Sequence, residues 1–188
     1  MRWCFRLFVA FALVGVLVGA LVGTLAGGKA AWAAGPAEAL PQPTGEVLLT
    51  VGGAIGRGNA QDAGGHRIAA FDRAMLERLG LHRVETATPW HSGKVRFEGT
   101  LLRDVLTAVQ ADGTSLHAVA LNDYVIDIPV SDAERYDVIL ALKANGDWLT
   151  LRSKGPVFVV YPYDSDPALR RDVIYYRSIW QLRRIDIR

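Results

Sequence analysis

The sequence predicts an α+β domain in which a β-rich mixed sheet is accompanied by a few short helices. Apolar residues alternate with polar ones, or run together, over stretches of strand length along much of the chain. Helical spacing of apolar residues is confined to short segments. Asn145-Gly146 lies between two strand-like stretches and is a strong hairpin signal. Together these patterns indicate a β-rich domain.

The elements are expected in a definite order. Strands are expected at residues 47–51, 83–88, 117–121, 124–128, 138–143, 148–151, 156–161 and 178–187. Short helices are expected at residues 72–80, 100–109 and 131–136, the first with Asp72 and the third with Ser131 as its N-cap. The glycine-rich stretch 52–65 is expected to be a flexible loop and not a phosphate-binding one, because it lacks a Gly-Lys-Ser/Thr ending.

The N-terminal segment has the features of a secretory signal. An almost unbroken apolar run, residues 7–27, follows Arg2 and Arg6. The run leads to Ala31-Trp32-Ala33, which fits the small-x-small pattern of a cleavage site. We therefore expect a signal peptide at residues 1–33.

The same apolar run has an alternative interpretation as a retained membrane anchor. It is long enough to span a bilayer, and glycines recur at every fourth position from Gly15 to Gly27. A linker rich in Ala and Pro is expected at residues 34–45 and the folded domain at 46–188. Both interpretations predict a periplasmic domain, exported by a Sec-type signal and either free or anchored in the inner membrane.

Charge and cysteine content exclude several classes of protein. The full chain has a net charge of +2, but loss of the signal would remove Arg2, Arg6 and Lys29 and no acidic residue. The remaining 155 residues would carry 18 basic and 19 acidic side chains, a net charge of −1, which gives nucleic-acid binding no support. Cys4 is the single cysteine, so a disulfide scaffold and a cysteine-ligated zinc site are excluded.

Four stretches of the chain resemble one family in their order and spacing. They are VRFEGTLLRDVL (95–106), ALNDYVIDIP (120–129), NGDWLTLRSKGP (145–156) and RSIWQLRRI (177–185). The chain resembles the sulfite-oxidase-like, or oxidoreductase, molybdopterin-binding domain family, and within it small exported members. The resemblance implies a reduced version of the sulfite-oxidase-like molybdopterin-binding fold, and a molybdopterin-dependent oxidoreductase as the associated activity.

The chain departs from that family where the cofactor is held. Family enzymes ligate molybdenum through a cysteine thiolate, and the resemblance places that position at about Thr86, whose hydroxyl is not a soft ligand. The chain is also shorter than the family's full cofactor domain, and no Arg-Arg pair of a twin-arginine signal precedes the apolar run. We expect no bound cofactor, with molybdopterin as the alternative that the resemblance implies.

No catalytic or metal-binding set is evident in the sequence. The four histidines are dispersed, and no serine lies in a Gly-x-Ser-x-Gly motif. The resemblance instead implies that segments around Trp90 and Tyr124 border a cleft, and that segments around Tyr161 and Tyr175-Tyr176 flank the strands that close it. The candidate ligand-binding residues are Trp90, His91, Arg96, Asn122, Asp123, Tyr124, Tyr161, Asp164 and Arg177. Such a cleft would hold a small anion or an aromatic metabolite; the alternative is that these residues form turns and fill the core.

Arginines cluster near the C-terminus. Strand alternation predicts that Arg183 and Arg184 lie on opposite faces of the last strand. They form either a surface for an acidic partner or a solvated basic edge that discourages strand pairing.

Two functional hypotheses follow. The first is a non-enzymatic accessory or sensory module that binds a small molecule or a membrane signalling partner, and touches the membrane only through an uncleaved N-terminal segment. The second is a periplasmic molybdopterin-binding oxidoreductase with a redox partner. A structural subunit of a larger oxidoreductase is a third possibility. The missing thiolate favours the first.

Overall fold

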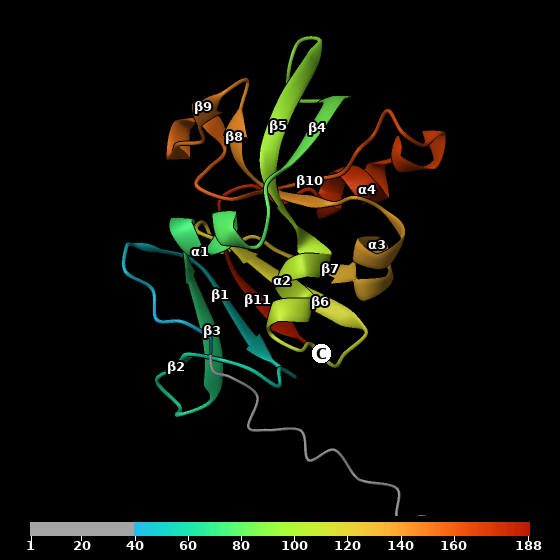
Figure 1. Cartoon of the computed structure of the whole chain (residues 1–188). Helices are drawn as coiled ribbons and strands as arrows, with labels where there is room; N and C mark the ends of the chain where they lie inside the picture. Colours follow the sequence, from blue (N-terminus) through green and yellow to red (C-terminus); the bar gives the residue numbers. More distant parts are fainter. Residues whose placement is uncertain (1–39) are drawn as a thin grey trace, which may run out of the picture. The chain divides into compact units, whose positions relative to one another are not determined.

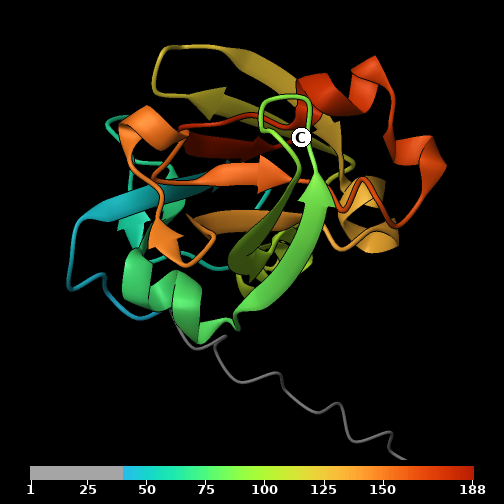
Figure 2. The ribbon, with the colours of Figure 1, turned by 90° about the horizontal axis from the view of Figure 1, so that it is seen from above.

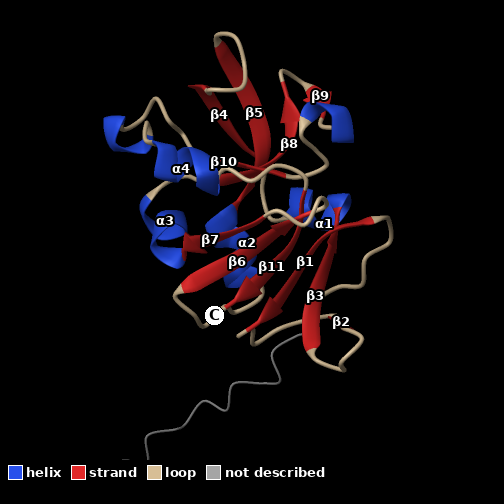
Figure 3. Ribbon diagram, turned by 180° about the vertical axis from the view of Figure 1, so that it is seen from behind, coloured by secondary structure: helices blue, strands red, loops and turns tan. Residues whose placement is uncertain are grey.

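Two β-sheets and the short helices around them make up the part of the chain that the computed structural model describes, residues 40–188 (Figure 1). The six-stranded sheet has the order β2-β3-β1-β11-β6-β7. Its strands are β1 (Val47–Gly53), β2 (Ala60–Gln61), β3 (Arg67–Asp72), β6 (Ser115–Ala120), β7 (Val125–Pro129) and β11 (Leu182–Ile187). Figure 3 shows β3, β1, β11 and β6 side by side.

The five-stranded sheet has the order β10-β8-β5-β4, with β9 paired to β8. Its strands are β4 (His82–Ala87), β5 (Lys94–Leu101), β8 (Ile139–Ala144), β9 (Asp147–Trp148) and β10 (Phe158–Val160). The helices of the described part are α1 (Arg73–Arg78), α2 (Leu102–Ala108), α3 (Val130–Arg135), α4 (Asp172–Arg177) and the 3-10 helices η1 (Leu151–Ser153) and η2 (Pro167–Leu169). Figure 2 shows α3 and α4 on one side of the five-stranded sheet, and η1 with β9 on the other.

The expected α+β class is confirmed, and most expected elements are present. Asp72 caps α1 as expected, since its Oδ1 accepts a hydrogen bond from the Met75 N–H at 2.8 Å. The hairpin at Asn145-Gly146 joins β8 to β9. The expected cap at Ser131 is wrong: α3 begins one residue earlier, and Pro129 occupies the cap position without a side-chain hydrogen bond.

The start of the expected last strand is also corrected. Strand β11 begins only at Leu182, and residues 172–177 form α4, a helix that the sequence patterns did not indicate. Strand β3 was missed as well. The expected loop at 52–65 contains the last two residues of β1 and the short strand β2.

The membrane-related expectations fall on residues that the structure does not describe. The signal peptide at 1–33, its alternative as an anchor, and most of the linker lie outside residues 40–188. Within the described range, no helix combines the length and the apolar content that crossing a bilayer requires.

The strand nearest the C-terminus occupies the middle of the six-stranded sheet. β11 pairs with β1 in parallel, Thr50 opposite Arg184, and with β6 in the antiparallel direction. The interpretation of its arginines as a basic sheet edge is therefore wrong. A register shift between Leu182 and Arg184 interrupts the pairing with β6, and both Arg183 and Arg184 are exposed. A bulge places two residues opposite one, so alternation is lost there and the two arginines line one groove.

One hydrophobic core connects the two sheets. Leu49 and Leu116 contribute from the six-stranded sheet, and Phe97, Leu140 and Phe158 from the five-stranded sheet, all at 0% exposure. Close packing of this kind fixes the ends of the strands and the turns that follow them. Except for Arg96 in β5 and Arg177 in α4, the predicted ligand-binding residues described next lie on those turns.

Candidate functional site

An aromatic pocket of about 310 Å³ lies where four segments of the chain meet. These are the loop after β4, the turn between β6 and β7, the helix α4, and the stretch that leads into β11. The lining residues are Pro89, Trp90, Ala120, Asn122, Tyr124, Tyr175, Tyr176, Ser178, Ile179 and Trp180. Half of them are tryptophan or tyrosine, so flat rings make up a large part of the wall.

Trp90 holds the rings of the wall together. Its ring centroid lies 5.6 Å from that of Trp180 and 6.2 Å from that of Tyr175, both edge-to-face. It also meets the buried ring of Phe158 at 5.8 Å. The Thr88 hydroxyl accepts the Trp90 N–H at 3.3 Å and fixes the loop after β4. Edge-to-face contacts of this type stabilise a rigid arrangement of rings, so the pocket is largely preformed.

The mouth of the pocket is formed by the turn between β6 and β7. Asp123 adopts a positive φ of 63°, and the Tyr124 N–H donates to Asn122 Oδ1 at 3.2 Å. The Tyr124 hydroxyl donates to the Tyr176 carbonyl at 3.4 Å, which joins the turn to α4. Tyr124 and Tyr176 are 43% and 65% exposed, so their rings remain reachable from solvent.

The lining of the pocket is uncharged. Among the described residues that line it, none is Asp, Glu, Lys, Arg or His. Ser178 is 2% exposed, and its hydroxyl is already engaged by Tyr163 and by the Ile174 carbonyl. The polar side-chain groups of the lining besides Ser178 are therefore the amide of Asn122, the tyrosine hydroxyls and the indole N–H groups of Trp90 and Trp180.

Three of the nine predicted ligand-binding residues, Trp90, Asn122 and Tyr124, line this pocket together. Asp123 lies in the same turn but points its carboxylate to Arg183 at 2.6 Å. Tyr175 and Tyr176 were expected only to flank the cleft, whereas they form part of its wall. Trp180, Ile179 and Pro89 were missed. The signal that would have found Trp180 is its position just after the Tyr175-Tyr176 pair.

His91 and Arg96 lie away from the pocket lining. The His91 Nδ1 is 2.7 Å from the Thr88 hydroxyl, and its ring packs on Phe97 with centroids 5.7 Å apart. Burial lowers the pKa of His91, and the charge of Lys154 lowers it further. Arg96 is exposed on β5, where its side chain approaches Glu98 at 3.8 Å. These two residues support the five-stranded sheet.

Tyr161 and Arg177 meet at a third residue, Asp132 of α3. The Tyr161 hydroxyl and Arg177 Nη1 both donate to Asp132 Oδ2 at 2.8 Å. Tyr161 is fully buried, and that burial raises the pKa of its hydroxyl. The network ties α4 to α3, so Arg177 positions the α4 residues that form the pocket wall but does not face the pocket.

Asp164 supports the end of β4. Its Oδ2 accepts the Ala87 N–H at 3.1 Å and lies 3.3 Å from Lys94 Nζ, and its Oδ1 accepts from Arg170 at 2.7 Å. The Ala87 N–H lowers the pKa of the Asp164 carboxyl; burial opposes this effect, and the bonds to Lys94 and Arg170 add to it. Asp164 is thus a charged anchor beside a shallow depression and not part of the aromatic pocket.

No described residue supplies the thiolate through which the resembled family holds molybdenum. Thr86, at the position where the resemblance places the thiolate, is 0% exposed, and its Oγ1 accepts the Asp164 N–H at 3.1 Å. Within residues 40–188 no group of three or more His, Cys, Asp or Glu side chains could hold a metal. The sole cysteine, Cys4, lies outside that range.

Comparison with known proteins gives one family. A family model described as the oxidoreductase molybdopterin binding domain matches residues 69–164, just over half of the 188-residue chain. No curated protein matches the chain. The matched region includes Trp90, Asn122 and Tyr124, whereas Tyr175, Tyr176 and Trp180 follow it. The pocket therefore combines family residues with residues outside the matched region.

Proposed function

The chain belongs to the oxidoreductase molybdopterin-binding domain family, and from that premise we propose that it is a ligand-binding module of the family that works without the cofactor. The observation that carries the proposal is the uncharged, aromatic-walled pocket. Its ligand is a neutral, flat and largely apolar molecule. The module is periplasmic, either free or held at the inner membrane by its N-terminal segment, and acts as an accessory or sensory protein.

The size and chemistry of the pocket support this ligand class. A volume of about 310 Å³ suits a molecule of two fused rings, at the lower end of ordinary ligand pockets. Ring-on-ring contacts contribute about 0.5–1.5 kcal/mol each beyond area burial. A charged ligand would lose water without gaining an ionic partner from the lining, which disfavours it. Asn122 supplies the hydrogen bond that orients a polar substituent.

The first experiment compares two probes of equal shape, 2-naphthamide and 2-naphthoate, by NMR titration of the purified protein. We expect the neutral amide to shift the indole signals of Trp90 and Trp180, and the anion to bind at least about tenfold more weakly. Tyr176→Ala should weaken the binding of 2-naphthamide. Val173→Ala is the matched control, because Val173 is exposed on the same helix but does not line the pocket. Equal binding of both probes, or shifts elsewhere, would overturn the proposal.

The family match itself favours a second candidate, a molybdopterin-dependent oxidoreductase. Molybdenum and pterin content of the protein, exported to the periplasm of a molybdenum-replete host, separates the two candidates. We expect neither in stoichiometric amount. Near-stoichiometric molybdenum would refute the proposal that the module works without the cofactor, whatever the naphthalene probes show.

A further inference from the structure

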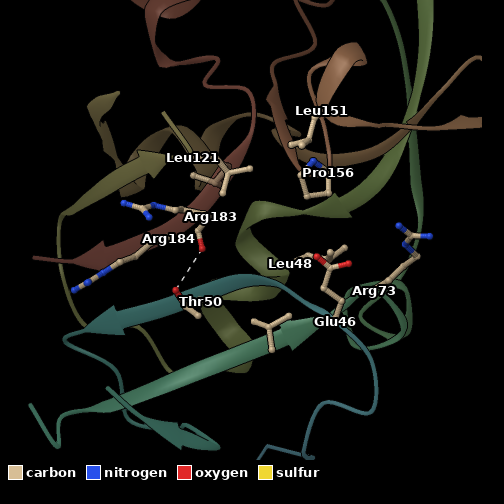
Figure 4. A pocket seen from close by; sticks show the side chains of 11 residues that line it. Glu46, Leu48, Thr50, Arg73, Leu121, Leu151, Pro156, Arg183 and Arg184 are labelled. Carbon is tan, nitrogen blue, oxygen red and sulfur yellow. Dashed lines mark hydrogen bonds between the residues drawn. The ribbon is translucent and has the colours of Figure 1, made fainter. Parts of the chain in front are cut away.

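A second and larger depression lies beside the aromatic pocket, on the other side of the turn between β6 and β7. This groove has a volume of about 610 Å³ and opens at the start of β1 (Figure 4). β1 begins at Val47, but its ladder with β11 begins only at the pair Thr50 and Arg184. The opposite wall is formed by Leu121, which follows β6, and by Leu151 and Pro156, which precede β10. Along the chain, Leu121 of the groove lies between Ala120 and Asn122 of the aromatic pocket, and only Gln181 separates Trp180 of the pocket from Leu182 of the groove.

The groove exposes large apolar side chains. Leu151 is 60% exposed, Leu121 45% and Val47 43%, and all three line it. Pro156 and the buried Leu48 also line the groove. Apolar side chains gathered at one depression, as opposed to scattered singly, mark interaction surfaces.

Arginines stand at both ends of the groove. Figure 4 shows Arg183 and Arg184 on one side and Arg73 on the opposite side, with the leucines and Pro156 between them. Arg73 has no carboxylate partner among the described residues, and its guanidinium lies 4.2 Å over the Trp148 ring. Glu46 is the single acidic side chain of the lining. The groove is therefore cationic at its ends and apolar in its middle.

The two arginines of β11 retain unused donors. Arg183 is bound to Asp123, which is itself 81% exposed, and Arg184 is bound to Asp186 at 2.8 Å. A guanidinium has five N–H donors, so each can take a second carboxylate. The bulge between Leu182 and Arg184 is what brings both of them to the same groove.

We propose that this groove is a docking site for an extended segment of a partner protein, in which acidic residues flank a short apolar stretch. Charge complementarity carries the choice of occupant, because three arginines and one glutamate line the groove, and Asp123 and Asp186 use only some of the donors of Arg183 and Arg184. A small anion fits less well: the cations are separated, and Glu46 and leucines occupy the space between them. Apolar centres with arginines at the rim are typical of protein interfaces. This proposal does not depend on the ligand of the aromatic pocket.

The test uses a blocked hexapeptide, Asp-Glu-Leu-Leu-Glu-Asp, titrated into the full chain and followed by backbone amide NMR. We expect shifts at Val47, Leu121, Leu151 and Arg183, and affinity that falls as salt rises. A peptide with lysines in place of the acids, and one with serines in place of the leucines, should each bind at least about tenfold more weakly. No shifts at about 1 mM peptide, or equal binding of the lysine peptide, would overturn the proposal.

Matched variants separate the groove from the rest of the surface. Leu151→Ser should lower the affinity for the acidic peptide about tenfold. Leu81 is also exposed but lies outside the groove, so Leu81→Ser should leave the affinity unchanged. Arg183→Ala should also lower the affinity for the acidic peptide. Arg83→Ala is the matched control and should leave that affinity unchanged, because Arg83, like Arg183, is exposed and paired with one carboxylate. Octanoate that binds as tightly as the peptide would assign the groove to a small anion. Self-association abolished by Leu151→Ser would assign it to a second copy. Either result would replace the proposal.

Discussion

Asp72 holds together the start of the domain, and replacing it with asparagine tests that role. The carboxylate is 2% exposed. Its Oδ1 accepts the Met75 N–H at 2.8 Å, while its Oδ2 accepts the N–H groups of Thr44 at 2.7 Å and Gly45 at 2.9 Å. Asparagine keeps one acceptor oxygen. If that oxygen caps α1, the amide NH₂ faces two N–H donors that have lost their acceptor.

The magnitude follows from those two donors. An unsatisfied buried donor costs about 1–3 kcal/mol, and Thr44 and Gly45 are exposed enough for water to replace part of the loss. We expect Asp72→Asn to lower the free energy of unfolding by about 2 kcal/mol at pH 7. Urea unfolding followed by tryptophan fluorescence measures it, with Asp147→Asn on the exposed hairpin as the control.

The pH dependence provides a second readout of the same change. The Met75 N–H lowers the pKa of the Asp72 carboxyl; burial opposes this effect, and the Gly45 and Thr44 N–H groups add to it. Since the pKa is lower in the folded state, the stabilisation is complete above the unfolded value of about 3.9 and is lost as pH falls below it. The gap between wild type and variant should therefore narrow below about pH 4. A loss under about 0.5 kcal/mol, or a gap independent of pH, would refute the reasoning.

Two further changes probe the five-stranded sheet. Gly99→Ala should cost more than about 3 kcal/mol or prevent folding, because a Cβ there would lie 2.0 Å from the Leu140 carbonyl oxygen. Gly45→Ala is the control: a Cβ there would meet no atom closer than 3.7 Å, so thermal stability should change by less than about 0.5 kcal/mol. Equal losses of stability in the two variants would contradict the close packing at Gly99. Burial and the charge of Lys154 lower the pKa of His91, so its contribution is complete above about pH 6.5 and lost as pH falls further. His91→Gln should flatten the stability profile between about pH 7 and 5, and an unchanged profile in unfolding experiments would count against this role.

Local chemistry made much of the fold predictable. The Asp72 cap and the Asn145-Gly146 turn depend on residues within a few positions of each other, and both are present. Helix α4 is different: it is six residues long and buries only Ile174, so its sequence has no helical repeat of apolar residues from which it could be predicted. The bulge beside Arg183 depends on how β11 pairs with β6. The alternation of residues along β11 alone carries no information about that pairing.

The site was predictable only in part for the same reason. Trp90, Asn122 and Tyr124 converge as the resemblance implied. Tyr161 and Arg177 instead meet Asp132, which lies 29 and 45 positions away from them. The hydrogen-bond partners of a buried carboxylate are brought to it by the tertiary fold, and no local sequence pattern indicates which tyrosine or arginine will bind it. Their use as ligand-binding residues stays a prediction that ligand titration would test.

The position of β11 in the centre of its sheet has a consequence for the order of folding. Thr50 and Arg183 are in contact across 133 positions, so the β1–β3 and β6–β7 pairs have no common neighbour until residues 182–187 have been synthesised. Long-range pairing of this kind slows folding. A nascent chain stays open, with two unpaired strand edges, until β11 has been synthesised. Proteolytic removal of β11 should then unfold the whole six-stranded sheet and not merely fray one end.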